Sequence, residues 1–115
     1  MPFRSADSAL PLTPMAFEIL LALAEEDRHG YAILQAVETR LKGKLPLRTG
    51  TLYRALARLV DDGLIEEIEG AAEEDTRRRV YRITKRGRTV ARAETERLAD
   101  QVAAARTRKL APGRS

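Results

Sequence analysis

Residues 49–62 constrain the fold of this chain more than any other segment, because they predict a helix with two chemically different faces. Aliphatic residues recur at the spacing of a helix that packs on a core: Leu52, Leu56, Leu59 and Val60. Polar residues occupy the opposite side: Thr51, Arg54, Arg58 and Asp61. Thr49 is the expected N-cap, and Gly63 stands where a left-handed residue is expected after the helix. The segment therefore predicts a short, core-anchored helix with a charged outer face.

The outer face of this helix suits a groove lined by phosphates. Helix N-termini bind phosphate through their unpaired backbone N–H groups, which makes Thr49, Gly50 and Thr51 candidates to hold one. Arginine binds phosphate and also reads guanine edges, so Arg54 and Arg58 are the candidates for base recognition. The alternative is an ordinary amphipathic surface helix whose arginines are only solvated.

Two further helices are predicted before this segment. Thr13 and Pro14 form a helix start, with threonine as the N-cap and proline at the first helical position. This helix should end near Glu25, where a polar break over residues 25–28 begins, and its predicted core-facing residues are Phe17, Leu20, Leu21 and Ala24. A second helix is expected over residues 29–42 and should bury an aliphatic face: Ile33, Leu34, Val37 and Leu41.

The hydrophobic period changes after the central helix and predicts an antiparallel hairpin. Residues 64–69 and 77–83 are the expected strands, and residues 70–76 are the expected loop. The second strand alternates apolar and polar residues. The buried face of the first strand stays open, because Leu64 and Ile65 are both apolar and point opposite ways.

Thr84 is the expected N-cap of a long final helix that runs to about residue 106. Small and apolar residues follow one another along it in alternating three- and four-residue steps: Ala91, Thr95, Leu98, Val102 and Ala105. This spacing is that of a coiled-coil seam, although it is shorter than the three to four heptads that define a coiled coil. These residues are the candidate dimerisation face.

The predicted order of elements is three helices, two strands and a long helix, which is a mainly α fold with a small β-hairpin. This is the architecture of a winged helix-turn-helix, in which the third helix enters the major groove and the hairpin, or wing, touches the flanking backbone. The 115-residue chain suits one domain. We expect a flexible segment at 1–11, the winged helix-turn-helix at 12–83, a dimerisation helix at 84–108 and a disordered tail at 109–115.

Charge is segregated in the second half of the chain. Acidic residues come first: Asp61, Asp62, Glu66, Glu67, Glu69, Glu73, Glu74 and Asp75. Basic residues follow without an acid among them: Arg77, Arg78, Arg79, Arg82, Lys85, Arg86, Arg88 and Arg92. The wing arginines Arg77, Arg78 and Arg79 are candidates to bind phosphates beside the groove. Alternatively they pair with glutamates of the first strand, where each exposed pair contributes about 0.2–1 kcal/mol.

The composition argues against other classes of protein. Aromatic residues make up only 4% of the chain, too few for a platform that stacks single-stranded nucleic acid, whereas the net charge of +4 favours a polyanionic partner. The absence of cysteine excludes disulfides and thiolate metal sites. His29 is the only histidine, and the chain carries no catalytic triad, P-loop or dinucleotide fingerprint, so we expect no enzyme, metal or cofactor.

No apolar run approaches the roughly 20 residues of a membrane span, and the first residues lack an export signal. A cytoplasmic protein with no membrane partner is therefore expected. Among the tyrosines, Tyr31 and Tyr81 are expected as core rings, while Tyr53 either donates its hydroxyl to a phosphate or packs against the core.

The chain resembles the PadR-like transcriptional regulators over about residues 12–90. The resemblance rests on a combination of motifs in the expected order and spacing: LTP at 12–14, ILLAL at 19–23, HGYAI at 29–33, GTLYRALARL at 50–59, DGLI at 62–65 and RVYRITKRG at 79–87. Each motif alone would be weak, and the combination is specific.

The resemblance implies a homodimeric bacterial or archaeal transcription factor, usually a repressor that binds an inverted-repeat operator and is released by a small effector. It makes the helix of residues 49–62 the recognition helix, places Arg78 and Arg79 in the wing, and places His29 and Tyr31 near the DNA backbone. The helix after residue 84 would be the dimerisation helix. Because this helix contains no aromatic residue, we expect no pocket that stacks a planar ligand, and an aliphatic pocket remains open.

The sequence thus predicts a dimeric regulator that binds double-stranded DNA, with a small-molecule effector of unknown identity. Two rivals remain. One is a winged helix that binds a partner protein through its acidic strand and uses no DNA. The other is a binder of structured RNA.

Overall fold

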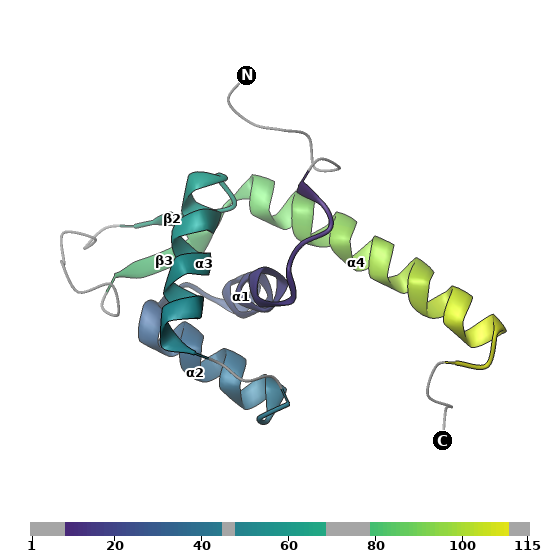
Figure 1. Ribbon diagram of the computed structural model, residues 1–115. Coiled ribbons are helices and arrows are strands. Elements are labelled where there is room, and N and C mark those ends of the chain that lie inside the picture. The colour runs from purple at the N-terminus through teal and green to yellow at the C-terminus, as the bar shows by residue number, and fades with distance from the viewer. Residues whose placement is uncertain (1–8, 45–47, 69–78, 111–115) are drawn as a thin grey trace.

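A computed structural model describes residues 9–44, 48–68 and 79–110. The helices are α1 (Pro14–Glu25), α2 (Gly30–Leu41), α3 (Thr49–Asp61) and α4 (Lys85–Thr107), and the strands are β1 (Arg28–His29), β2 (Ile65–Glu67) and β3 (Val80–Ile83) (Figure 1). The predicted mainly α winged helix-turn-helix with a long C-terminal helix is confirmed. The proposed segment boundaries remain predictions, since residues 1–8 and 111–115 lie outside the described ranges.

Helix α1 begins as expected, and its buried face is shifted from the predicted one. Thr13 caps it, because its Oγ1 accepts from the Ala16 N–H at 3.0 Å. The predicted stripe was right at Leu20, which is fully buried, but Phe17 and Leu21 are only half-buried and Ala24 is exposed. The other fully buried aliphatics are Ile19 and Leu23. The predicted and the observed buried residues both fit a helical period. The observed ones are buried because α1 contacts α2, α3, α4 and β3 at once.

Helix α3 has the predicted core face, with Leu52, Leu56 and Leu59 buried and Val60 half-buried. Its start differs, because the N-cap is Arg48, without a side-chain cap bond, and Thr49 is already helical. The expected left-handed Gly63 is confirmed at φ 77°. Gly63 N donates to Val60 O and Leu64 N donates to Leu59 O, both at 3.0 Å, which is the Schellman pattern that ends a helix.

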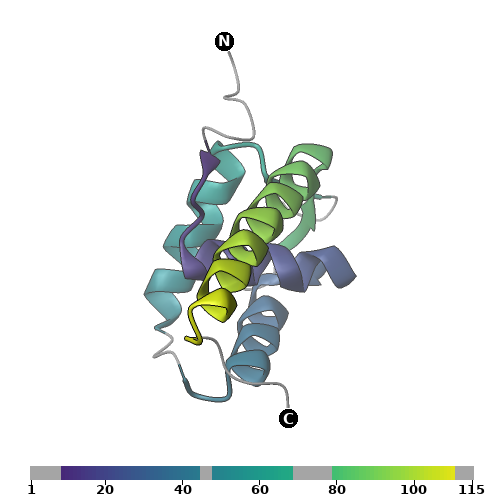
Figure 2. The ribbon, with the colours of Figure 1, turned by 90° about the vertical axis from the view of Figure 1, so that its right-hand side faces the viewer.

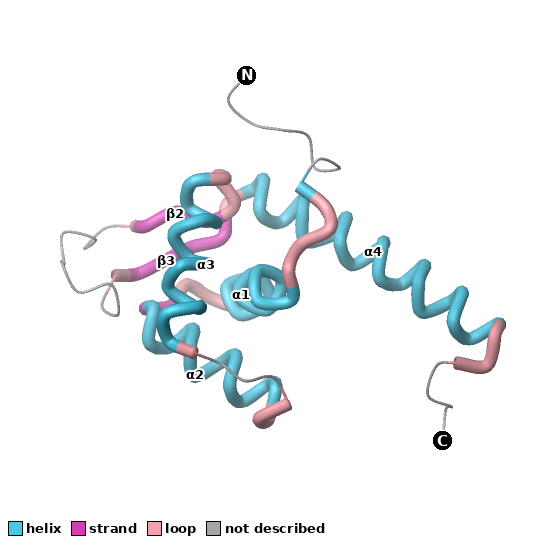
Figure 3. The backbone as a smooth tube through the Cα atoms, viewed as in Figure 1, coloured by secondary structure: helices cyan, strands magenta, loops and turns pink. Residues whose placement is uncertain are grey.

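The sheet has the strand order β1-β3-β2 with antiparallel pairing, and it lies at one side of the helical body (Figure 3). The predicted hairpin is confirmed in the described part, with Ile65 opposite Ile83. Strand β1 was missed, because residues 25–28 were predicted as a polar break. A two-residue strand has no period of its own, and only its pairing with Tyr81 and Val80 reveals it.

The open question of the first strand's buried face is resolved by the turn that precedes it. Leu64 and Ile65 are both 1% exposed. Leu64 belongs to the turn after α3 and not to β2, so the two side chains reach the core from different local backbones. In β3 the predicted alternation holds, with Tyr81 and Ile83 buried and Arg82 exposed.

Helix α4 is anchored at its start and extends away from the rest of the fold at its end (Figures 1 and 2). Thr84 caps it as predicted, accepting from Gly87 N at 2.9 Å. The residues that α4 buries within the chain are Gly87, Val90 and Glu94. Beyond them Val102 is 42% exposed. The distal part of α4 therefore presents apolar surface that its own domain does not cover.

Glu94 is a buried carboxylate, 2% exposed, where α4 leaves the domain. Arg97 donates to both of its oxygens, at 2.9 and 2.8 Å, and the backbone N–H of Leu12 donates to it as well. The Arg97 hydrogen bonds, helped by that of Leu12, hold the pKa of Glu94 below its usual range although burial opposes the charge. The carboxylate thus ties the segment before α1 to α4.

We expect Glu94→Gln to lower the free energy of unfolding by about 1–3 kcal/mol near neutral pH, because the ion pair with Arg97 is lost and the amide NH2 of glutamine cannot accept the second Arg97 hydrogen bond. A folded-state pKa below the unfolded value means that this stabilisation is present above pH ~4.5 and is lost as the pH falls through the folded-state pKa. Urea unfolding at several pH values should show the difference between variant and wild type shrinking in acid. A difference that is constant down to pH ~3 would contradict this assignment.

Candidate nucleic-acid interface

The N-terminal end of α3 is an exposed polar surface. Arg48, Thr49, Gly50 and Thr51 are all exposed, as is Arg54 one turn further on. The Arg54 Nη2 lies 3.5 Å from Thr51 Oγ1, so the guanidinium folds back toward the start of its own helix. The predicted phosphate-binding residues and the predicted base reader thereby share one surface at the end of α3 that carries the positive end of the helix dipole.

Arg58 lies further along the same face. Its Nε is 3.6 Å from Asp62 Oδ2, while 75% of its side chain remains exposed. An exposed i, i+4 pair contributes only about 0.3–0.5 kcal/mol, so Asp62 restrains Arg58 without holding it away from a ligand. Arg54 and Arg58 therefore both stand where a groove would meet α3.

Tyr53 lies at the border of this surface and the core. Its side chain is half-buried and packs against the core residues, and its hydroxyl is enclosed within the protein. Between the two roles predicted for Tyr53, this burial favours packing over phosphate contact.

The start of α2 adjoins the wing. His29 is exposed and is the N-cap of α2, and Tyr31 is 51% exposed, not the core ring that was predicted. Gly30 is buried, and its N–H donates to Arg79 O at 3.1 Å. The backbone bond holds the first turn of α2 against β3, which brings His29 and Tyr31 beside the base of the wing.

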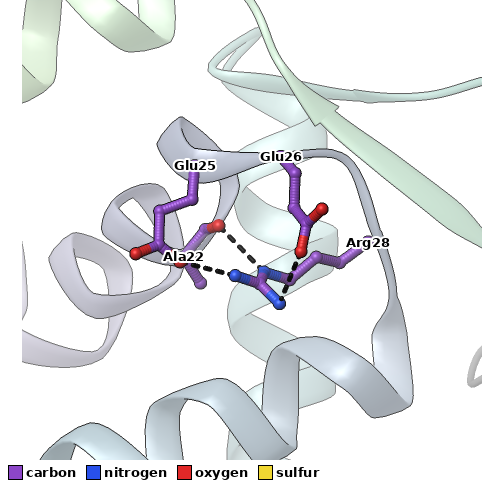
Figure 4. A network of polar contacts seen from close by, with 4 residues as sticks. All are labelled: Ala22, Glu25, Glu26 and Arg28. Atoms are coloured by element: carbon purple, nitrogen blue, oxygen red, sulfur yellow. Dashed lines mark hydrogen bonds and ion pairs between the residues drawn. The ribbon is translucent and has the colours of Figure 1, made fainter.

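Arg28 fixes this start of α2 to the end of α1 (Figure 4). Its Nη2 donates to Glu25 Oε1 at 2.6 Å, its Nε donates to Ala22 O at 3.0 Å, and its Nη1 lies 3.4 Å from Glu26 Oε2. At the other end of the two helices, Arg40 binds both carboxylate oxygens of Glu18, at 2.6 and 2.5 Å. Helix α2 is therefore held to α1 at both ends.

Cross-strand pairing accounts for arginines of the described wing. Arg79 Nη1 lies 3.3 Å from Glu67 Oε2, and Arg82 Nε lies 3.1 Å from Glu66 Oε2. This is the alternative that the sequence left open, and it applies to Arg79. Arg77 and Arg78, also predicted to bind DNA, lie outside the described residues.

Three exposed cations beside the turn of the helix-turn-helix were not among the predicted site residues. Lys42 and Lys44 are exposed after α2, and Arg48 is exposed before α3. Lys42 adopts a left-handed backbone, φ 51°, which turns the chain between the helices of the helix-turn-helix. The available signal was the concentration of cations around this turn, although the sequence of residues 44–47 predicts only a short extended link.

The candidate dimerisation residues of α4 differ in how far they are buried within the chain. Ala91 is half-buried against the domain's own core, and Thr95 is exposed with its Oγ1 donating to Ala91 O at 2.8 Å. Leu98 and Ala105 are half-buried and Val102 is exposed. The seam predicted from spacing is thus partly used within the chain at its start and left uncovered towards its end.

The part of the chain that the structure describes contains no group of three or more His, Cys, Asp or Glu side chains able to hold a metal ion. Among those residues no helix is long and apolar enough to cross a membrane.

A core-anchored third helix with an exposed basic face, a three-stranded wing sheet and a projecting C-terminal helix define a winged helix-turn-helix protein. The chain belongs to the transcriptional regulator PadR-like family, which it matches over residues 19–93. The resemblance predicted from the motifs is therefore confirmed, and the members of this family are regulators of transcription, not enzymes.

Solved structures agree with this assignment. A transcriptional regulator from Clostridium thermocellum is 33% identical, with a TM-score of 0.64 over 77% of this chain and 85% of the other. RosR of H. salinarum is 32% identical, with a TM-score of 0.62 over 83% and 78%. A PadR family transcription regulator from Clostridium difficile R20291 shares the fold at 22% identity, with a TM-score of 0.68 over 83% and 97%.

A curated protein from Lysinibacillus sphaericus is 34% identical over 70 residues. The match covers 61% of this chain and 64% of the length of that relative.

Proposed function

We propose that this protein is a homodimeric transcriptional repressor that binds an inverted-repeat operator in double-stranded DNA and is released by a small effector. The observation that carries the proposal is the surface of α3, where exposed Thr49, Thr51, Arg54 and Arg58 stand on a helix whose other face is packed on the core. A helix held this rigidly can present donors to base edges without first ordering itself.

The proposal divides the interface into two parts. Arg54 and Arg58 read bases, while the N-terminus of α3 and the cations Lys44 and Arg48 bind the phosphate backbone. His29, Tyr31 and the wing arginines extend the backbone contact beside the groove. Arg79 would exchange its weak pairing with Glu67 for a phosphate, since an exposed pair of this kind contributes little.

The acidic strand gives less support to the rival protein-interaction module. Of the acidic block Glu66–Asp75 that motivated it, Glu66 pairs with Arg82 of β3, and Glu67 pairs with Arg79, the residue before β3. The pairing reduces the acidic surface that these two glutamates offer to a partner, while Glu69, Glu73, Glu74 and Asp75 lie outside the described residues.

Binding of random-sequence duplex DNA, measured by fluorescence anisotropy at about 50 and 200 mM salt, tests the proposal. We expect binding at the lower salt that weakens steeply at the higher one, and we expect a structured RNA to compete poorly. Failure to bind duplex DNA at either salt would contradict the proposal and favour the protein-interaction module. Preference for the RNA would favour the RNA-binding rival.

The homodimer is proposed to form through the uncovered part of α4. We expect Val102→Asp to raise the dimer dissociation constant at least about 100-fold, because the seam would have to bury a charge. The matched control is Gln101→Asp, which adds the same charge at the neighbouring exposed position outside the seam. Sedimentation equilibrium at micromolar concentrations measures both. Equal effects of the two substitutions would show that α4 does not pair along this seam.

A further inference from the structure

The end of α3 and the start of α4 are bonded through three successive carbonyls. Arg86 Nε donates to Asp62 O at 3.2 Å, Thr84 Oγ1 donates to Gly63 O at 2.7 Å, and Thr84 N donates to Leu64 O at 3.0 Å. We call this set the α3–α4 joint: Asp62, Gly63 and Leu64 on one side, and Thr84, Arg86 and Gly87 on the other.

The joint is held both by hydrogen bonds of Thr84 and by the close packing of Gly87 against Leu64, and together they make it stiff. Thr84 Oγ1 also accepts from Gly87 N, so one hydroxyl caps α4 and binds the turn after α3. Gly87 brings the backbone of α4 against the turn, where a Cβ would lie 2.1 Å from Leu64 O. Since the Schellman bonds fix the same turn to α3, the α3 helix, the turn and α4 form one hydrogen-bonded unit.

This unit links the helix proposed to read DNA to the helix proposed to dimerise. The seam residues Leu98 to Ala105 lie 12 to 19 residues beyond Arg86, or about 18–28 Å along a helix. A tilt of about 10° at the joint would displace a seam at about 20 Å by about 3.5 Å, close to the 3.4 Å rise of one base pair. Helix α4 also packs on α1, so the joint and this packing together hold its angle, which determines how far apart two α3 helices would lie in a dimer.

We propose that Arg86 and Thr84 are positioning residues that set the distance between the two recognition helices, and so the half-site spacing that the dimer accepts. Neither residue contacts DNA in this role; both act through the carbonyls that end α3. The inference rests on the proposed homodimer and adds to it the residues that determine operator spacing.

Distances between spin labels test the joint without DNA. The chain has no cysteine, so Ala57→Cys on the exposed face of α3 gives one label per protomer. We expect a single narrow inter-label distance in this background. Adding Arg86→Ala should broaden the distribution or shift its mean by about 3 Å or more, the displacement that a tilt of about 10° produces. A label at exposed Arg92 of α4 itself should give the same distance with and without Arg86→Ala.

The outcomes separate the two proposals. If the protein labelled at Ala57→Cys, without Arg86→Ala, gave no inter-label distance, both the homodimer and this inference would be overturned. A narrow distance that Arg86→Ala leaves unchanged would overturn the joint's role and leave the homodimer intact. Because Arg86→Ala could also act by loosening the fold, Thr84→Val provides a second test. It should broaden the distance, and Thr84→Ser, which restores the hydroxyl, should narrow it again.

A DNA readout completes the test. With an operator whose half-site spacing is varied one base pair at a time, Arg86→Ala should reduce the preference for the best spacing by about threefold or more, as loss of one hydrogen bond allows. Affinity for an isolated half-site should not change. The matched control is Arg88→Ala, an exposed cation of the same helix turn. Equal losses at every spacing and at the isolated half-site would instead make Arg86 a phosphate contact, contrary to the proposal.

Discussion

Replacing Gly87 by alanine is expected to lower the free energy of unfolding by about 2 kcal/mol or more. Alanine is the better helix former by about 1 kcal/mol, but the added Cβ would lie 2.1 Å from Leu64 O and 2.8 Å from Ile83 Cγ1. Overpacking usually costs about 1–3 kcal/mol. We expect a cost at the upper end of this range or above it, because the 2.1 Å contact is with a backbone carbonyl, which cannot swing aside as a side-chain end can. Helix α4 would have to move off the turn after α3.

Thermal unfolding followed by circular dichroism measures this effect, and a loss of about 2 kcal/mol corresponds to a fall of roughly 10 °C in Tm. Gly50→Ala is the matched control, because its Cβ would meet only Arg54 Nη1 at 3.4 Å, the movable end of an exposed side chain. That variant should be as stable as wild type or more so. Equal Tm values for Gly87→Ala and wild type would show that α4 does not approach the turn as closely as described.

The second large effect is expected at Arg54. Arg54→Ala should weaken operator binding by about 1–3 kcal/mol and relax the preference for one base pair in each half-site. Arg54→Lys distinguishes base reading from phosphate binding, since lysine keeps the charge and loses the two-pronged donor geometry. We expect Arg54→Lys to keep the salt dependence of wild type and lose the base preference.

Binding of variants to the operator and to its single-base substitutions, at fixed salt, measures both quantities. Arg58→Ala should weaken binding by a similar amount, because the 3.6 Å pairing with Asp62 leaves 75% of the Arg58 side chain exposed. If the Arg54→Lys variant kept the full base preference of wild type, Arg54 would be a phosphate contact, and another residue of α3 would read the base.

The sequence was sufficient wherever a pattern spans several turns or a motif fixes a cap. The buried stripe of α3, the Thr13 and Thr84 caps, Gly63 and the hairpin all follow from such local rules. The family itself followed from the combination of motifs.

The misassigned face of α1 and the missed strand β1 depend on neighbours distant in sequence. The face of α1 was shifted because Phe17 and Leu21 fit a helical period as well as Ile19 and Leu23 do, and only packing on four elements decides between them. Strand β1 exists only through its pairing with β3. The start of α3 was misplaced by one residue at Thr49, which is a good cap by type but is already inside the helix.

The sequence predicted which residues of the candidate site are exposed on α3, but it did not predict which partners the site residues contact. The exposure of Thr51, Arg54 and Arg58 follows from the helical period of α3. The enclosure of the Tyr53 hydroxyl and the pairing of Arg79 with Glu67 do not, because both are set by the register and packing of the sheet. Burial of the Glu94 carboxylate was equally unforeseen, since its partners are Arg97 and the backbone of Leu12, from the opposite end of the chain.

The central claim is that two copies of α3 read base sequence on one duplex, and a selection of random duplex DNA against the purified protein tests it most directly. The selection should be repeated at about 50 and 200 mM salt, so that phosphate binding and base reading separate. The account predicts a two-fold symmetric motif whose half-sites lie about one helical turn, or about 34–36 Å, apart. Enrichment of no motif, with all binding lost at the higher salt, would contradict it.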